Sequence, residues 1–150
     1  MLGVHHSAIC TSDVERSLRF WRDGLGLSQL IDYHFTGDWP ELFGAATDRL
    51  RSIFLGDPQT PGSGIVELVE LAGAGPALPA SSATTRAPRH GFFLLSFQRD
   101  VDQTLAGLAA LGFTEGVRRI DVVAPDGRTV AMAVIIAPDG VLVELIGRAQ

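Results

Sequence analysis

The stretch that decides the fold of this chain is Ile135-Ile136-Ala137-Pro138-Asp139-Gly140-Val141-Leu142-Val143-Glu144-Leu145-Ile146. Its Pro138-Asp139-Gly140 segment is a turn signal, because proline presets φ and glycine tolerates positive φ. The apolar runs on both sides of this turn predict a β-hairpin. The second arm places the carboxylate of Glu144 among apolar residues. Because burying an unpaired carboxylate is costly, such a group is usually paired, protonated or bound to a metal.

An earlier stretch repeats this pattern of an acid within an apolar strand. It reads Gly64-Ile65-Val66-Glu67-Leu68-Val69-Glu70-Leu71. Alternation along a strand puts Glu67 on the same face as Ile65 and Val69, and we expect Glu70 to face solvent. Two apolar strands with an acid at matching places predict a duplicated module with a shared acidic centre.

The remaining elements follow the same order in each half of the chain. Helical spacing of apolar residues predicts a helix after Asp13 and another after Asp100, ended by glycines. The alternating and apolar runs predict the strands. The expected strands are 4–11, 27–35, 51–55 and 65–71 in the first half, and 92–97, 113–123, 128–137 and 141–146 in the second, with a short helix near 41–45.

Each half therefore reads as strand, helix, strand, strand, strand, which predicts an α+β fold of two βαβββ modules. Repeat one covers about 1–72 and repeat two about 90–148. Between them, about 73–89, the chain is rich in Ala, Gly, Pro, Ser and Thr, which is typical of a linker. At 150 residues, the whole chain 1–150 is expected to form a single domain.

Composition excludes several classes of function. The hydrophobic fraction of 46% is that of an ordinary globular protein, and the net charge of −5 argues against nucleic acid as the main partner. No apolar run approaches the roughly 18–20 residues of a membrane span, and no signal peptide is visible, so we expect no membrane partner and a cytoplasmic location. Cys10 is the only cysteine, which fits a reducing cytoplasm, and we expect it to be a small buried filler.

Four segments together resemble the vicinal oxygen chelate superfamily, which includes glyoxalase I, methylmalonyl-CoA epimerase, extradiol dioxygenases and the fosfomycin- and bleomycin-resistance proteins. They cover nearly the whole chain outside the linker. The first two are His6-Ser7-Ala8-Ile9-Cys10-Thr11-Ser12-Asp13 and Ser17-Leu18-Arg19-Phe20-Trp21-Arg22-Asp23-Gly24-Leu25-Gly26-Leu27; the others are Ile65-Val66-Glu67-Leu68 and Pro138-Asp139-Gly140-Val141-Leu142-Val143-Glu144-Leu145.

The resemblance implies a glyoxalase-like fold, in which two modules form an eight-stranded open cup around a divalent metal. By position, His6, Glu67 and Glu144 correspond to three of the four metal ligands. The fourth comes from the fifth strand and falls on Phe92 or Phe93, neither of which can bind a hard cation.

His90 is a possible replacement for the missing ligand, or a substrate contact. It lies two residues before Phe92, and so on the same face of an extended strand, but about 6.6 Å away along it.

One histidine and two carboxylates favour Mn²⁺, Mg²⁺, Co²⁺, Ni²⁺ or Zn²⁺. Iron is less favoured, since its facial triad takes two histidines and one carboxylate. A metal held by His6, Glu67 and Glu144 would polarise a substrate carbonyl, and Glu67 or Glu144 would remove the α-proton. The resemblance thus implies an enzyme: an isomerase, an epimerase or a glyoxalase-type lyase.

Two alternatives remain open. One is a metal-free protein that binds or sequesters a small molecule, with Phe92, Phe93 and Trp39 among the residues that line its cup. The other is an extradiol-type dioxygenase. The resemblance also implies a homodimer, and in each case the expected partner is a small molecule.

Overall fold

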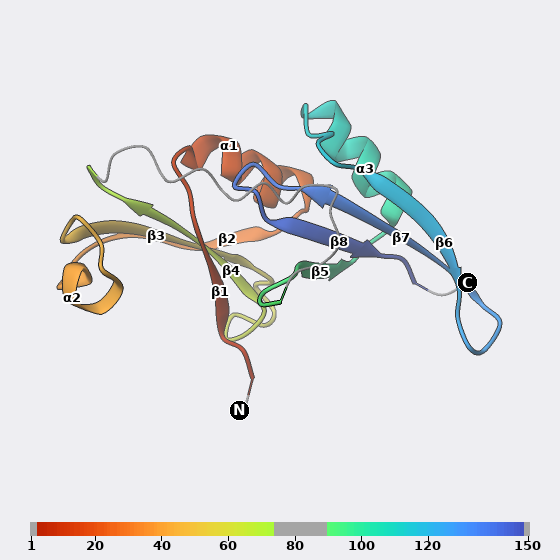
Figure 1. The fold of residues 1–150 in the computed structure, drawn as a ribbon, viewed down its shortest axis with the longest axis horizontal. Coiled ribbons are helices and arrows are strands. Elements are labelled where there is room, and N and C mark those ends of the chain that lie inside the picture. Colours follow the sequence, from red (N-terminus) through yellow and green to blue (C-terminus); the bar gives the residue numbers. More distant parts are fainter. Residues whose placement is uncertain (1–2, 74–89, 149–150) are drawn as a thin grey trace. The chain divides into compact units, whose positions relative to one another are not determined.

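The computed structural model describes residues 3–73 and 90–148 of the chain. The chain divides into two compact units, Met1–Leu78 and Pro79–Gln150. Figure 1 shows one helix-bearing sheet in each unit. Each unit is described by itself below.

Unit one holds a four-stranded sheet with the strand order β1-β4-β3-β2. The first strand of the unit pairs parallel to the last one, and the other pairs are antiparallel. The elements are β1 (His6–Cys10), α1 (Val14–Leu18), η1 (Arg19–Gly24), β2 (Ser28–Thr36), α2 (Trp39–Phe43), β3 (Arg49–Gly56) and β4 (Ile65–Leu71).

The core of unit one lies on one face of this sheet. Ile9, Ile53 and Leu68 stand opposite one another on neighbouring strands, and all three are buried. Val14 and Leu18 of α1 and the following Phe20 and Trp21 are also buried, which gives the helices their apolar side. We call this side of the sheet its helix face and the opposite side, which carries His6 and Glu67, its open face.

The helix after Asp13 begins as the sequence predicts but does not keep a regular α-helical period. The Asp13 side chain accepts a hydrogen bond from the Arg16 N–H at 3.0 Å, so Asp13 is the N-cap. From Arg19 the chain widens into the π-helix η1, and the Leu25 N–H donates to the Phe20 carbonyl five residues back at 2.9 Å. The wider turn still buries Trp21 and Leu25.

Unit two repeats the topology of unit one, with strand order β5-β8-β7-β6. Here too the first strand pairs parallel to the last. The elements are β5 (Leu95–Gln98), α3 (Val101–Ala110), β6 (Arg118–Val123), β7 (Thr129–Ile136) and β8 (Leu142–Ile146). Ala133, Ile135, Val143 and Leu145 form the buried helix face of this sheet, and α3 contacts β7.

The fifth strand is shorter than the sequence predicts, because it begins at Leu95 rather than at Phe92. Leu95 pairs with Val143, and continuing this parallel register would set Phe92 opposite Gly140, in the turn before β8. No strand residue is there to bond with it. Phe92 and Phe93 accordingly lie outside the sheet, 73% and 51% exposed.

The predicted α+β fold of two βαβββ modules is confirmed, and the two four-stranded sheets are not closed into a barrel. Assembly of both sheets into one cup, and of residues 1–150 into one domain, stay predictions. The expected linker at 73–89 lies outside the described residues, apart from Gly73. No helix in the described part of the chain is long and apolar enough to cross a membrane.

Candidate metal and substrate site

The first half of the candidate site lies on the open face of the sheet in unit one. The parallel register pairs Ala8 with Glu67, so His6 and Glu67 lie on one face of adjacent strands. His6 Nε2 is 3.2 Å from Glu67 Oε2. The Glu67 side chain is 14% exposed and that of His6 39% exposed, so the pair is reached from solvent through the imidazole.

Ser52 of β3 fixes the other oxygen of Glu67. Its hydroxyl donates to Glu67 Oε1 at 2.5 Å, and Ser52 itself is buried. Because both carboxylate oxygens have partners, the desolvation that accompanies the partial burial of Glu67 is offset. Ser52 is a site residue that the sequence analysis did not identify. A lone hydroxyl within the apolar strand Leu50–Leu55 was the available signal.

His5 completes a line of hydrogen bonds behind His6. The two Nδ1 atoms are 2.8 Å apart, so one ring donates and the other accepts. With His6 protonated on Nε2 and donating to Glu67, His5 is the Nδ1 donor. Both rings also lie against Phe54, with centroids 5.9 Å and 5.5 Å from its ring. These contacts with His5 and Phe54 fix the orientation of the His6 imidazole.

The second half of the candidate site lies on the open face of the sheet in unit two. Ser96 of β5 pairs with Glu144 of β8, and the Ser96 hydroxyl donates to Glu144 Oε1 at 2.8 Å. Glu144 Oε2 has no hydrogen-bond or ion-pair partner among the described residues. The carboxylate of Glu144 is therefore held through one oxygen and is the freer of the two acids.

The two parallel registers identify the position in unit two that matches His6. His6 lies two residues before Ala8, which pairs with Glu67. In unit two, Ser96 pairs with Glu144, and the residue two places earlier is Leu94. The missing fourth ligand therefore corresponds to Leu94 rather than to Phe92 or Phe93. A leucine side chain has no donor atom, so neither Leu94 nor the two phenylalanines could supply the expected fourth ligand.

The remaining predicted site residues do not gather around these acids within their own units. His90 is exposed and lies six residues before Ser96, outside β5. Trp39 begins α2, where its ring stacks on Phe43 with centroids 5.7 Å apart. Cys10 is exposed, so the expectation that it is a buried filler was wrong. It ends β1 on the open face of the sheet in unit one.

An ion pair between Arg51 and Asp32 lies on the helix face of unit one rather than at the candidate site. Arg51 makes two hydrogen bonds of 2.8 Å to the Asp32 carboxylate. These bonds lower the pKa of Asp32 below its ordinary value and raise that of Arg51. The pair joins β2 to β3 and so stabilises the sheet.

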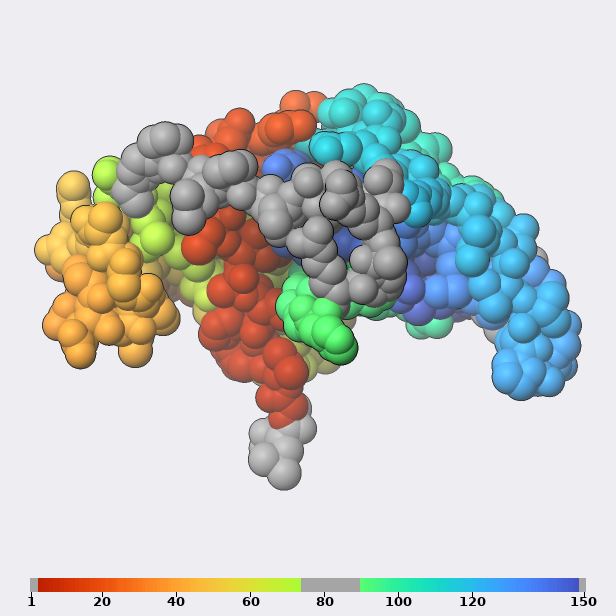
Figure 2. Space-filling model, viewed as in Figure 1, coloured from red at the N-terminus to blue at the C-terminus, as the bar shows by residue number. Residues whose placement is uncertain are grey.

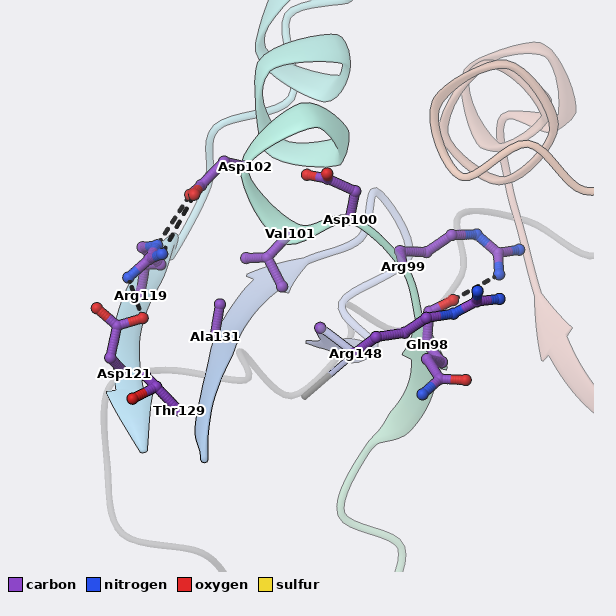
Figure 3. Close-up of a pocket in the computed structure, with 11 residues that line it drawn as sticks. Gln98, Arg99, Asp100, Val101, Asp102, Arg119, Asp121, Thr129, Ala131 and Arg148 are labelled. Carbon is purple, nitrogen blue, oxygen red and sulfur yellow. Dashed lines mark hydrogen bonds and ion pairs between the residues drawn. The ribbon is translucent and has the colours of Figure 1, made fainter. Parts of the chain in front are cut away.

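Unit two also contains a polar cavity on its helix face (Figure 3). Arg119 reaches Asp102 at the start of α3 and Asp121 on its own strand, both at 2.8 Å. Hydrogen bonds to these two carboxylates raise the pKa of Arg119. Neither Glu144 nor Ser96 lines this cavity. Because the charge of Arg119 in this cavity is paired with Asp102 and Asp121, we assign the candidate site to the open face instead.

The donor atoms of the open face fit a divalent cation. An imidazole nitrogen and a carboxylate oxygen 3.2 Å apart are donors that Mn²⁺, Ni²⁺ and Zn²⁺ accept. Across residues 3–73 and 90–148, no three His, Cys, Asp or Glu side chains lie together as a ready metal cluster. The predicted third ligand, Glu144, belongs to unit two.

Residues 3–145 match the model of the Glyoxalase/Bleomycin resistance protein/Dioxygenase superfamily. The chain belongs to this superfamily. It is also 33% identical, over 149 residues, to the lactoylglutathione lyase-like protein terB of Aspergillus terreus; the match spans 97% of this chain and 75% of that protein.

Solved structures of the same family share the fold. A glyoxalase family protein from Bacillus cereus aligns with a TM-score of 0.73 and 16% identity, over 98% of this chain and 94% of the other. The trypanothione-dependent glyoxalase I of Leishmania major aligns with a TM-score of 0.61 and 23% identity, over 98% and 87%.

Proposed function

We propose that this protein is a metal-dependent enzyme that removes a proton next to a substrate carbonyl, as an isomerase, epimerase or glyoxalase-type lyase. The observation that carries the proposal is the His6–Glu67 pair, held in place by Ser52 and His5 on an open sheet face. Metal-binding side chains are typically oriented by hydrogen bonds from neighbouring groups that do not bind the metal themselves. Similarity to a lactoylglutathione lyase-like protein supports the reaction class.

His6, Glu67 and Glu144 would hold the metal. A divalent ion, when bound, supplies Lewis-acid polarisation of a substrate carbonyl, which makes the neighbouring C–H more acidic. The proposal requires the two open faces to share one cavity, as the superfamily resemblance implies.

The two acids differ in what they can do. Glu67 has both oxygens engaged, by Ser52 and by His6, which suits a fixed ligand. Glu144 has one oxygen held by Ser96, and its second oxygen is free among the described residues to take a proton. We therefore assign proton transfer to Glu144, with Ser96 orienting the carboxylate.

The first substrate to test is the hemithioacetal formed from methylglyoxal and glutathione, because the relative from Aspergillus terreus is named for lactoylglutathione. Protein purified without chelator is expected to carry about one divalent ion per site. Glu144→Gln, assayed at a metal concentration that saturates the site, should lower turnover by about 10²–10⁴-fold, the usual contribution of a general base. Glu67→Gln should lose the metal.

Glu70→Gln is the matched control, because Glu70 lies on the same strand as Glu67 but on the opposite face. It should keep both metal and turnover. Absence of metal in the wild-type protein, or full turnover in Glu144→Gln, would contradict the proposal. Elemental analysis and a spectrophotometric assay measure the two quantities.

A metal-free binding protein is the second candidate. Leu94 in place of a fourth ligand favours it, and so do the exposed rings of Phe92 and Phe93. A protein without metal that binds apolar small molecules, and binds them equally well after Glu144→Gln, would establish this alternative. A dioxygenase is less favoured, because its two-histidine triad has no counterpart at Leu94.

We also propose that the protein is a homodimer in the cytoplasm. Membership of the superfamily supports the dimer, and the single cysteine supports the compartment. Light scattering at micromolar concentration tests the first point, and fractionation of the producing cells tests the second.

A further inference from the structure

The open face of the sheet in unit two carries one positive charge at the level of Glu144. The registers place four residues in a row across the sheet: Ser96, Glu144, Val134 and Arg118. Their side chains share one face. Arg118 therefore lies two strands from Glu144, a separation of roughly 10 Å between backbones.

Arg118 and Glu144 are the two charged residues among the strand positions of this face. The polar positions beside them are Ser96 and Gln98. All other strand positions on the face are apolar: Leu142 and Ile146 on β8, Val130, Met132, Val134 and Ile136 on β7, and Ile120 and Val122 on β6. A charged pair at opposite sides of an apolar strip suits a molecule with an apolar middle and two polar ends.

The guanidinium of Arg118 has no carboxylate partner within residues 3–73 and 90–148. No hydrogen bond or ion pair joins it to another residue in the described part of the chain. Its neighbour Arg119 faces the other way and is held by Asp102 and Asp121. On the open face, Glu144 takes its hydrogen bond from Ser96 rather than from Arg118.

An arginine in this setting is suited to a carboxylate. The guanidinium is always charged and presents paired N–H donors that match the two oxygens of a carboxylate. Such charge-assisted bonds are about twice as strong as neutral ones.

We propose that Arg118 binds a carboxylate of the small-molecule substrate. The apolar part of the substrate then lies over Val134 and Met132, and its reacting carbon lies at Glu144. This inference rests on the proposed function in one respect, namely that the substrate occupies this open face. It adds the substrate class: a carbonyl compound with an anionic group several bonds from the reacting carbon.

A charge on an edge strand also has a simpler use. β6 is an edge of its sheet, and charged residues there discourage pairing with another chain. That use needs no particular ligand and is served as well by other charges, so it predicts no difference between an acid and its neutral analogue.

The test is binding of matched probes to the protein as purified. The probes are phenylalkanoates with chains of two to five carbons and the corresponding amides, measured by isothermal titration calorimetry. At least one acid is expected to bind about tenfold more tightly than its amide. Arg118→Gln should lower the affinity of that acid to the level of the amide, and Arg118→Lys should keep part of the preference.

Arg128→Gln is the matched control. Arg128 lies on the same hairpin, paired with Asp126 at 2.7 Å, and its loss should leave the acid preference unchanged. The proposal is overturned if every acid binds with the same affinity as its amide, or if none of the probes binds. It is also overturned if Arg118→Gln keeps the preference.

The outcome is separable from that of the proposed function. A protein without metal or turnover that still prefers acids through Arg118 would support this inference and contradict the proposed metal-dependent enzyme. A metal-bound, active protein whose acid preference survives Arg118→Gln would support the proposed enzyme and overturn the role of Arg118.

Discussion

At the scale of single residues, Ser52 decides how Glu67 can act. A carboxylate that accepts from a buried hydroxyl cannot rotate freely, so Glu67 is already oriented toward His6. Orientation of this kind reduces the entropy that a metal must overcome on binding.

Ser52→Ala is expected to weaken metal binding about 10–100-fold, the usual effect of removing a group that orients a ligand. It should also cost about 1 kcal/mol of stability, because a partly buried oxygen loses its donor. Titration with Mn²⁺ or Ni²⁺ measures the first effect and urea unfolding the second. Ser7→Ala, on the opposite face of β1, should change the metal affinity little.

A pH-dependent contribution to stability is expected from Asp32. Hydrogen bonds from Arg51 lower its pKa in the folded state, so its charged form stabilises the fold. That stabilisation is fully present above the unfolded pKa of about 3.9 and is lost as the pH falls through the lower folded pKa.

Asp32→Asn should therefore lower the free energy of unfolding by about 1 kcal/mol at neutral pH, with the difference from wild type shrinking below about pH 4. Urea unfolding between pH 2.5 and 7 measures it. Asp23→Asn is a suitable comparison, because its pair with Arg22 is 39–40% exposed and should be worth half a kcal/mol or less. A pH-independent loss in Asp32→Asn would refute the linkage.

At the scale of elements, the connection from α3 to β6 depends on a glycine. Gly116 has φ +63°, and a Cβ there would lie 2.6 Å from the Ile136 side chain of β7. Both the backbone conformation and the close packing disfavour a larger residue at this position.

Gly116→Ala is expected to destabilise the protein by about 1–3 kcal/mol, from backbone strain and overpacking. Gly107→Ala is the matched control, and its expected effect on stability has the opposite sign. Gly107 lies in α3 with nothing within 4 Å of an added Cβ, so alanine should stabilise by about 0.5–1 kcal/mol. Equal effects of both variants in thermal unfolding would refute the argument.

The elements also show what sequence patterns can predict. Strand β4 matches the predicted 65–71, and the helices predicted after Asp13 and Asp100 begin there with these residues as N-caps, because local periodicity and capping chemistry determine them. The start of β5 could not be predicted, since it depends on where its partner β8 begins. The π-helical turn of η1 could not either, because it keeps the same residues buried as an α-helix would.

At the scale of the whole molecule, duplication was the most reliable signal. Two acids in two similar strands predicted two equivalent sheets, and the structure contains them. The site was partly predictable: the sequence identified His6 and Glu67, which the structure brings together, and Glu144, which stays a predicted partner. Ser52 and Ser96 were missed because their roles depend on register between strands, and His5 because strand alternation places it on the face opposite His6.

The match between the two units makes a prediction about the absent ligand. Leu94→His should raise the affinity for Ni²⁺ or Zn²⁺, by about tenfold or more if the new imidazole joins the site. Phe92→His should leave the affinity unchanged, because Phe92 lies two residues further from Ser96 than Leu94, about 6.6 Å along an extended chain, and is 73% exposed. Calorimetric titration compares the two. A larger gain in Phe92→His would show that the register argument is wrong.

The position of Leu94 also bears on how this lineage can change. A leucine codon of the CTC or CTT type becomes a histidine codon through one transversion, while the backbone that would present the new imidazole already exists. Gain or loss of a ligand therefore requires no insertion and no rebuilding of the scaffold. If Leu94→His tightens cation binding as expected, proteins with and without the tight site would differ by a single substitution.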